Sequence, residues 1–180
     1  MAVPRYDRPD PSEFAPFYAG YIAGVPDGDL LATLEQQGKD TQAALRGLAE
    51  SRGDYAYAPG KWTIKEILGH VADGERVFSY RALTFARGDS GPLPGFDEQA
   101  WTPASGARSR PLADLLADLA AVRGATLALL RGLTGDAPLR RGTANGQSIS
   151  VRALAWIIAG HELHHLRILR ERYLQAPQTS

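Results

Sequence analysis

The strongest constraint on the fold is a recurrence of apolar residues at helical spacing in four separate stretches of the 180-residue chain. The clearest of these follows Pro111, a residue that suits the first turn of a helix, and keeps a seven-residue period. Its apolar positions are Leu112, Leu115, Leu119, Val122, Leu129 and Leu133. Because such a stripe has to be buried against other helices, the chain is expected to form a helical bundle.

The other three stretches show the same spacing of three and four residues. One of them carries a strong start signal, since Thr63 and Glu66 are placed to satisfy each other's backbone donors as a capping box. In another, the apolar positions are Leu31, Leu34, Leu45 and Leu48. The expected bounds are residues 27–50, from Thr63 to about residue 87, and from Ser148 or Ser150 to about residue 173.

Segments rich in proline and glycine separate these helices. Residues 1–26 carry five prolines and are expected to form an extended or broken-helical arm. Residues 88–110 hold three prolines and four glycines and are expected to form one long loop. Asn145-Gly146 predicts a short β-hairpin. The sequence thus predicts an all-α, antiparallel four-helix bundle at 27–174, with a hairpin before its last helix and a C-terminal tail at 175–180.

Composition excludes several functions. The acidic and basic residues balance to a net charge of zero and form no basic run, so a nucleic-acid partner is not expected. No stretch is apolar enough to span a membrane and the N-terminus lacks the pattern of a signal peptide, so we expect a cytoplasmic protein. There is no cysteine, which excludes disulfides, thiolate metal sites and a cysteine nucleophile. Any thiol in its chemistry has to come from a substrate.

Three of the four histidines lie within His161-Glu-Leu-His164-His165 on the last predicted helix. His161 and His165 are one helical turn apart, which lets two imidazoles bind one ion, and they extend the apolar stripe of Leu154 and Ile158. A polar ring on a buried stripe is costly unless it is hydrogen-bonded or coordinated. The pair is therefore predicted to bind a metal, although satisfied core histidines would give the same pattern.

The fourth histidine, His70, is the candidate third ligand, and Gly74 one turn later would leave room beside its ring. His164 is a geometric alternative on the last helix. Asp73 is a candidate for orienting an imidazole from behind, or else an ordinary surface charge. Three neutral imidazoles suit zinc, nickel, copper or iron(II), with zinc and nickel preferred, and leave a position open for a small-molecule substrate.

Taken in order, several segments resemble the DinB/YfiT-like superfamily. They are Lys61 to His70, Glu75 to Phe78, Tyr80 to Leu83, Arg87 to Asp89, Pro94 to Asp97, His161 to His165 and Glu171 to Tyr173. The resemblance implies a four-helix bundle of up-down-down-up type, a homodimer, and a divalent metal ion held by three histidines. It places those ligands at His70, His161 and His165, and so selects His165 over His164.

Three functions are compatible with such a site. The resemblance implies first a thiol S-transferase that uses bacillithiol, mycothiol or glutathione as co-substrate, because the ion would help a bound thiol to ionise. It implies second a metal-dependent hydrolase. The residues also fit H-E-x-x-H, which would make Glu162 a general base, but a metzincin would need glycine and histidine where this chain has Ile168 and Glu171.

The third function is a non-catalytic module in which His164 or Asp73 closes the metal site as a fourth ligand. The 88–110 segment bears on this choice because it carries Phe96, Asp97 and Trp101. These residues could line a substrate pocket or only pack against one another.

Overall fold

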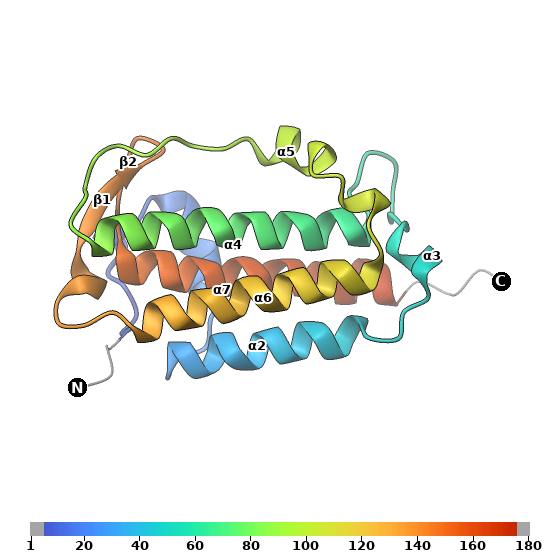
Figure 1. Ribbon diagram of the computed structural model, residues 1–180, viewed down its shortest axis with the longest axis horizontal. Helices are drawn as coiled ribbons and strands as arrows, with labels where there is room; N and C mark the ends of the chain where they lie inside the picture. Colours follow the sequence, from blue (N-terminus) through green and yellow to red (C-terminus); the bar gives the residue numbers. More distant parts are fainter. Residues whose placement is uncertain (1–5, 176–180) are drawn as a thin grey trace.

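Four long helices lie side by side in the computed structural model, which describes residues 6–175 (Figure 1). They are α2 (Leu30–Leu45), α4 (Ile64–Ala86), α6 (Leu112–Arg131) and α7 (Val151–Ile168). Helices α2 and α7 run in one direction and α4 and α6 in the other, as the up-down-down-up order implies. Each of α2 and α4 packs against both α6 and α7. The predicted bundle is confirmed, although two of its neighbouring pairs, α2 with α7 and α4 with α6, are parallel rather than antiparallel.

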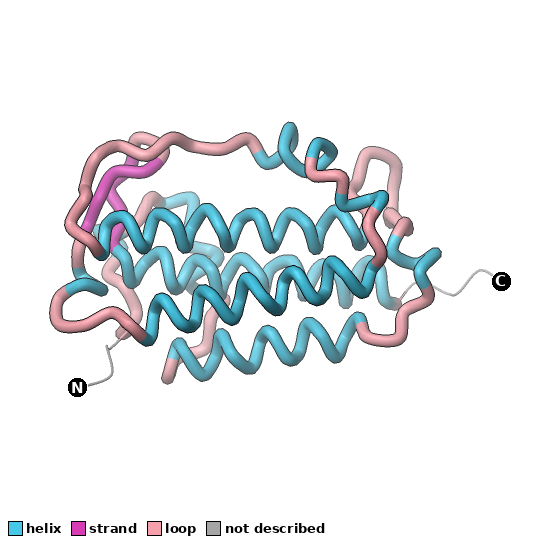
Figure 2. Tube along the Cα trace, in the orientation of Figure 1, coloured by secondary structure: helices cyan, strands magenta, loops and turns pink. Residues whose placement is uncertain are grey.

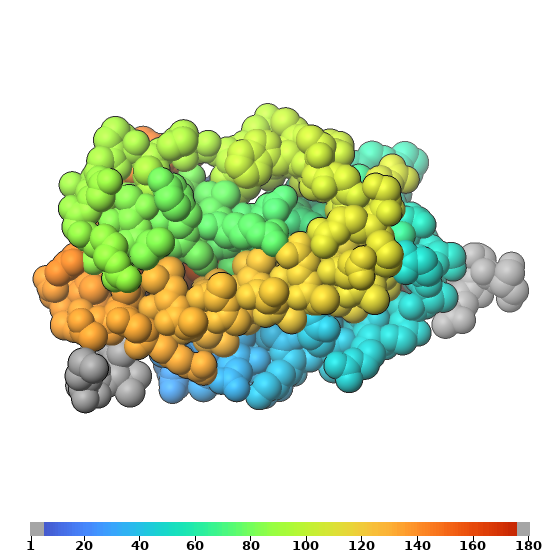
Figure 3. Space-filling view, in the orientation of Figure 1, coloured from blue at the N-terminus to red at the C-terminus, as the bar shows by residue number. Residues whose placement is uncertain are grey.

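The parallel arrangement of α4 and α6 depends on the long connection between them, which returns along the length of the bundle (Figures 1 and 3). The expectation that residues 88–110 form one loop is wrong in part, because α5 (Glu98–Ala104) and a 3-10 turn at Ala107–Ser109 lie within it. The side chain of Asp97 starts α5 by accepting hydrogen bonds from the N–H groups of Gln99 and Ala100 at 3.0 and 3.2 Å. This helix packs on α4.

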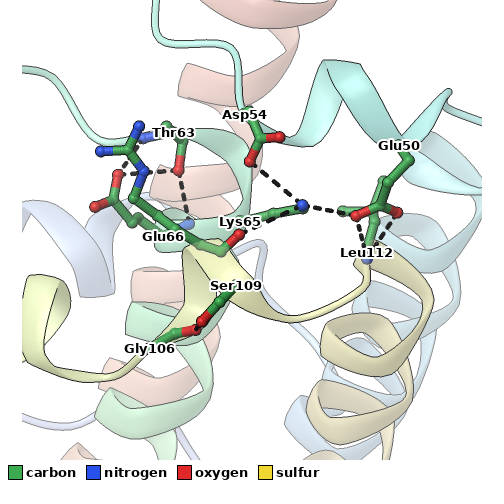
Figure 4. A network of polar contacts seen from close by, with 9 residues as sticks. Glu50, Asp54, Thr63, Lys65, Glu66, Gly106, Ser109 and Leu112 are labelled. Atoms are coloured by element: carbon green, nitrogen blue, oxygen red, sulfur yellow. Dashed lines mark hydrogen bonds and ion pairs between the residues drawn. The ribbon is translucent and has the colours of Figure 1, made fainter.

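The start of α4 is fixed by the predicted capping box and by a buried lysine (Figure 4). The backbone N–H of Thr63 donates to Glu66 at 2.8 Å, and the N–H of Glu66 donates to the Thr63 hydroxyl at 3.2 Å. Lys65 pairs with Glu50 at 2.6 Å, and the Glu50 carboxylate accepts from the N–H of Leu112 at 3.0 Å. The short helix α3 (Glu50–Gly53) and the starts of α4 and α6 are thereby held together.

The first long helix is shorter than expected. It ends at Leu45 rather than at residue 50, and the chain turns at Gly47, whose φ of 86° is a left-handed conformation that favours glycine. The predicted hairpin is confirmed as β1 (Arg141–Ala144) and β2 (Gln147–Ser150) (Figure 2). Asn145 and Gly146 both have positive φ, as a type I′ turn requires.

The N-terminal arm folds as two 3-10 turns, Pro11–Glu13 and Pro16–Tyr18, followed by α1 (Ala19–Ala23). It lies directly on α7, where a Cβ atom added to Gly160 would come within 2.2 Å of the Tyr21 carbonyl oxygen. Residues 1–5 of the arm and residues 176–180 of the predicted tail lie outside the described residues. Within the described part of the chain, no helix has the combination of length and apolarity that crossing a bilayer requires.

Candidate metal centre

The three predicted ligands come together between α4 and α7. The Nε2 atom of His161 lies 3.0 Å from Nε2 of His70 and 3.2 Å from Nε2 of His165. One ring nitrogen from each side chain falls within 4.8 Å of the others, and the three residues are only 6–9 % exposed. Ninety-one positions of sequence separate His70 from His161, so the fold, and not local spacing, assembles this cluster.

The donor set fits a divalent ion. Burial, together with the neighbouring histidines, lowers the pKa of His161 to about 3 and also lowers that of His165. Burial also lowers the pKa of His70, so all three rings are neutral at pH 7 and each offers a lone pair. In a tetrahedral site with metal–nitrogen distances of about 2.05 Å, the nitrogens lie about 3.3 Å apart, close to the two distances from His161 Nε2.

The surroundings of the cluster set the positions of the rings. Gly74 provides space, because an added Cβ would lie 3.0 Å from Cε1 of His161. Gly74 was expected to leave room beside His70, but the ring that it makes room for is that of His161 from the facing helix. Trp62 packs on His70 with ring centroids 4.7 Å apart, and Tyr21 meets His161 edge-on at 5.6 Å. Neither aromatic residue was predicted from the sequence to belong to the site.

Two other predicted site residues lie apart from the cluster. His164 is half-buried and packs against Tyr21, with ring centroids 5.3 Å apart, and its ring nitrogens are not among the converging ones. Asp73 pairs with Arg76 at 3.2 Å, and within residues 6–175 no hydrogen bond joins it to an imidazole. Asp73 therefore fits the alternative prediction of an ordinary helix charge, which acts on His70 through its charge and not through a hydrogen bond in the described residues.

Glu162 faces away from the histidines. One carboxylate oxygen accepts a hydrogen bond from the Thr41 hydroxyl at 2.7 Å, and the other lies 2.8 Å from a guanidinium nitrogen of Arg123. The same guanidinium makes two bonds to Glu75, at 2.9 and 2.8 Å. Glu162 thus belongs to a buried ion-pair cluster in the bundle core, and this geometry contradicts the H-E-x-x-H interpretation in which it would act as base.

A sequence profile of the DinB superfamily matches residues 33–169. The chain belongs to this superfamily. It is 24 % identical over 144 residues to a Bacillus subtilis protein named "Putative metal-dependent hydrolase YfiT", covering 78 % of this chain and 80 % of the relative. A Geobacillus thermodenitrificans protein named "Putative metal-dependent hydrolase" is 24 % identical over 137 residues, covering 75 % and 77 %.

A solved structure has a similar fold. It is that of YfiT from Bacillus subtilis, described as "a probable metal-dependent hydrolase with an unusual four-helix bundle topology". It superposes with a TM-score of 0.72 at 23 % identity, covering 79 % of this chain and 82 % of that one. The four-helix topology is thus shared with another structure.

In this DinB-superfamily bundle the histidines lie in a cavity of about 640 Å³. The arm, the 88–110 segment and the hairpin all contribute to its walls. Phe96 lines it and packs against the half-exposed Trp101, while Asp97 caps α5 instead. Phe96 therefore fits both predictions for the long connection, since it lines the cavity and also packs on Trp101. Sequence reasoning missed Tyr18, Tyr21, Trp62, Phe78, Arg81 and Glu98, which also line the cavity.

Proposed function

We propose that this chain is a metal-dependent enzyme that acts on a small molecule, with His70, His161 and His165 as ligands of one divalent ion and thiol S-transfer as its reaction. The observation that carries the proposal is the convergence of three buried, neutral imidazoles in a cavity large enough for a small substrate. When bound, the ion would supply positive charge that lowers the pKa of a thiol at its open position.

The position of Glu162 favours a thiol over water as the nucleophile. A thiol ionises with a pKa of about 8.5, against about 15.7 for water, so it needs far less assistance from a protein base. Glu162, which follows His161, is held by Thr41 of α2 and Arg123 of α6 and so is not placed to take a proton at the histidine cluster. The imidazoles carry no charge, so they leave the charge of an ion available to the nucleophile.

The aromatic residues of the cavity have a role that is separate from metal binding. Phe78 packs edge-on against His161 at 5.9 Å, and Trp62 covers His70. These rings exclude water from one side of the cluster, and the exclusion of water strengthens electrostatic interactions there. They also offer an apolar surface to the electrophile.

The test uses cobalt-substituted protein and the three thiols named above. At least one thiol should produce a sulfur-to-metal charge-transfer band, and its reaction with a model electrophile should be faster than in solution. Both effects should be absent in His165→Ala and present in His164→Ala. If none of the three thiols changes the cobalt spectrum, the S-transferase proposal is wrong.

A hydrolase is the second candidate, favoured by the names of the two relatives and by Glu98 in the cavity wall. Glu98 lines the cavity and acts electrostatically on His70, which makes its carboxylate the candidate base for an attacking water. In this case an ester would be hydrolysed without any thiol. The rate should fall in Glu98→Gln and stay unchanged in Glu162→Gln.

A further inference from the structure

We propose that Arg81 binds a carboxylate of the small molecule that occupies the cavity, and so determines which substrates reach the histidines. The inference rests on the proposed function for the site as a whole, but Arg81 is not one of the proposed metal ligands, and a variant that lacks a ligand separates its test from the metal. Arg81 is 3 % exposed and lines the same cavity as the three imidazoles.

The other buried cations of the described chain all have acidic partners. Lys65 pairs with Glu50 and Asp54, and Arg123 pairs with Glu75 and Glu162. Arg81 alone among them has no carboxylate within ion-pairing distance in residues 6–175. Burying a charge without a counter-ion is costly. A ligand that brings the missing negative charge would remove this cost.

The surroundings of Arg81 leave its charge uncompensated. One N–H donates to the Pro94 carbonyl at 2.7 Å, which ties the 88–110 segment to α4 but adds no charge. The phenol of Tyr18 lies beside the guanidinium, and burial raises the pKa of that phenol, so it stays neutral. Glu98 is the acidic residue of the cavity wall and does not pair with Arg81.

Helix geometry places Arg81 on the same face of α4 as His70. It follows His70 by eleven positions on α4, which is about three turns, so both residues lie on the same helix face. The guanidinium carbon is 5.9 Å from the Phe78 ring centroid, and that centroid is 5.9 Å from the ring of His161. Arg81 and His161 therefore lie within twice that distance of each other, with an aromatic surface between them.

These positions define a class of ligand. A planar carboxylate matches the fork of guanidinium N–H donors, and an apolar segment would pack on Phe78 while the reacting atom lies at the histidines. A single negative charge is favoured over a dianionic phosphate because Glu98 shares the cavity. Among thiols, the inference favours those that carry a carboxylate, such as glutathione and bacillithiol, over mycothiol, which has none.

The experiment measures calorimetric binding of 3-phenylpropionate and its neutral amide, and of glutathione and its diethyl ester, to the metal-loaded protein. Wild-type protein should bind at least one acid about tenfold to a hundredfold more tightly than its amide or ester, as expected for a hydrogen-bonded charge. Arg81→Gln should abolish this preference and Arg81→Lys should keep part of it. Arg76→Gln is the matched control, since Arg76 is an exposed arginine of the same helix outside the cavity.

Several outcomes would overturn the inference. One is an acid preference that survives Arg81→Gln, and another is the failure of every acid to bind wild-type protein. If Arg81 serves only to hold Pro94, the substitution would weaken acid and amide equally. The acid preference should persist in His165→Ala, which separates this result from the metal proposal, because it shows that the carboxylate is not bound by an ion.

Discussion

His161 and Glu162 are neighbours in sequence, but their side chains enter two buried polar clusters of opposite kinds. Around Glu162 the donors and acceptors complement one another, since Arg123 donates to two carboxylates and to the Leu34 carbonyl, at 2.6 Å for the latter. Around His161 three neutral rings bring their Nε2 atoms together: that of His161 lies 3.0 Å from that of His70 and 3.2 Å from that of His165. A buried cluster whose donors and acceptors pair with one another stabilises the fold. A cluster that brings several ring-nitrogen lone pairs together is instead suited to binding an ion.

The largest effect should come from the ion-pair cluster. Arg123→Ala leaves two buried carboxylates without their partner, so the free energy of unfolding should fall by about 3–5 kcal/mol. Urea denaturation of metal-free protein measures it. If Arg123→Ala costs no more stability than His161→Ala does in the same metal-free state, the contrast between the two clusters is lost.

The next largest effect should be a loss of metal-free stability at acid pH, which comes from the histidine cluster. Burial lowers the pKa values of His70, His161 and His165, that of His161 to about 3, so below about pH 6.5 the unfolded chain binds protons that the folded protein does not. The metal-free protein should therefore lose up to about 1.4 kcal/mol per pH unit for each of these histidines. Denaturation between pH 7 and 5 measures the slope, which should be smaller in His161→Ala. An equal slope in both proteins would contradict the assigned burial.

A more modest change should follow from Gly74→Ala. Helix propensity favours alanine by about 1 kcal/mol, but the new Cβ would lie 3.0 Å from the His161 ring and displace it. Metal affinity should fall about tenfold, without a matching loss of metal-free stability. Gly124→Ala is the control, because nothing lies within 4 Å of a Cβ there. Metal titration that gives equal affinities for the two variants would remove Gly74 from the site.

The smallest expected effect is that of His164→Ala. Its ring is half-buried beside Tyr21 and is not among the converging nitrogens, so metal content should stay at the wild-type level. Loss of the ion from this variant would show that the ligand chosen through the family resemblance is the wrong one of the adjacent pair.

Local patterns predicted much of the fold. The capping box at Thr63, the turn at Asn145-Gly146 and the apolar stripes fix elements through contacts between residues close in sequence. Helix α5 was missed because its start depends on one Asp97 cap within a segment full of proline and glycine. The early end of α2 depends on the left-handed turn at Gly47, which has no periodic signal.

For the candidate site, the sequence could predict which residues share one helix face and nothing beyond that. His161 and His165 share one face at the spacing of one turn, and Arg81 could have been found from its position three turns after His70. The partner of Glu162 could not have been predicted, because Arg123 lies on another helix. Most of α7 is buried, so burial alone does not show which way one of its side chains faces. For the same reason the sequence left open whether Asp73 orients a histidine or is an ordinary helix charge.

The central claim is that the two adjacent side chains have different roles, His161 as a metal ligand and Glu162 as part of the core. The most direct test is elemental analysis of wild-type, His161→Ala and Glu162→Gln proteins, purified without an affinity tag. We expect about one divalent ion per chain in the wild type and in Glu162→Gln, and almost none in His161→Ala. Full metal content in folded His161→Ala would contradict the three-histidine centre.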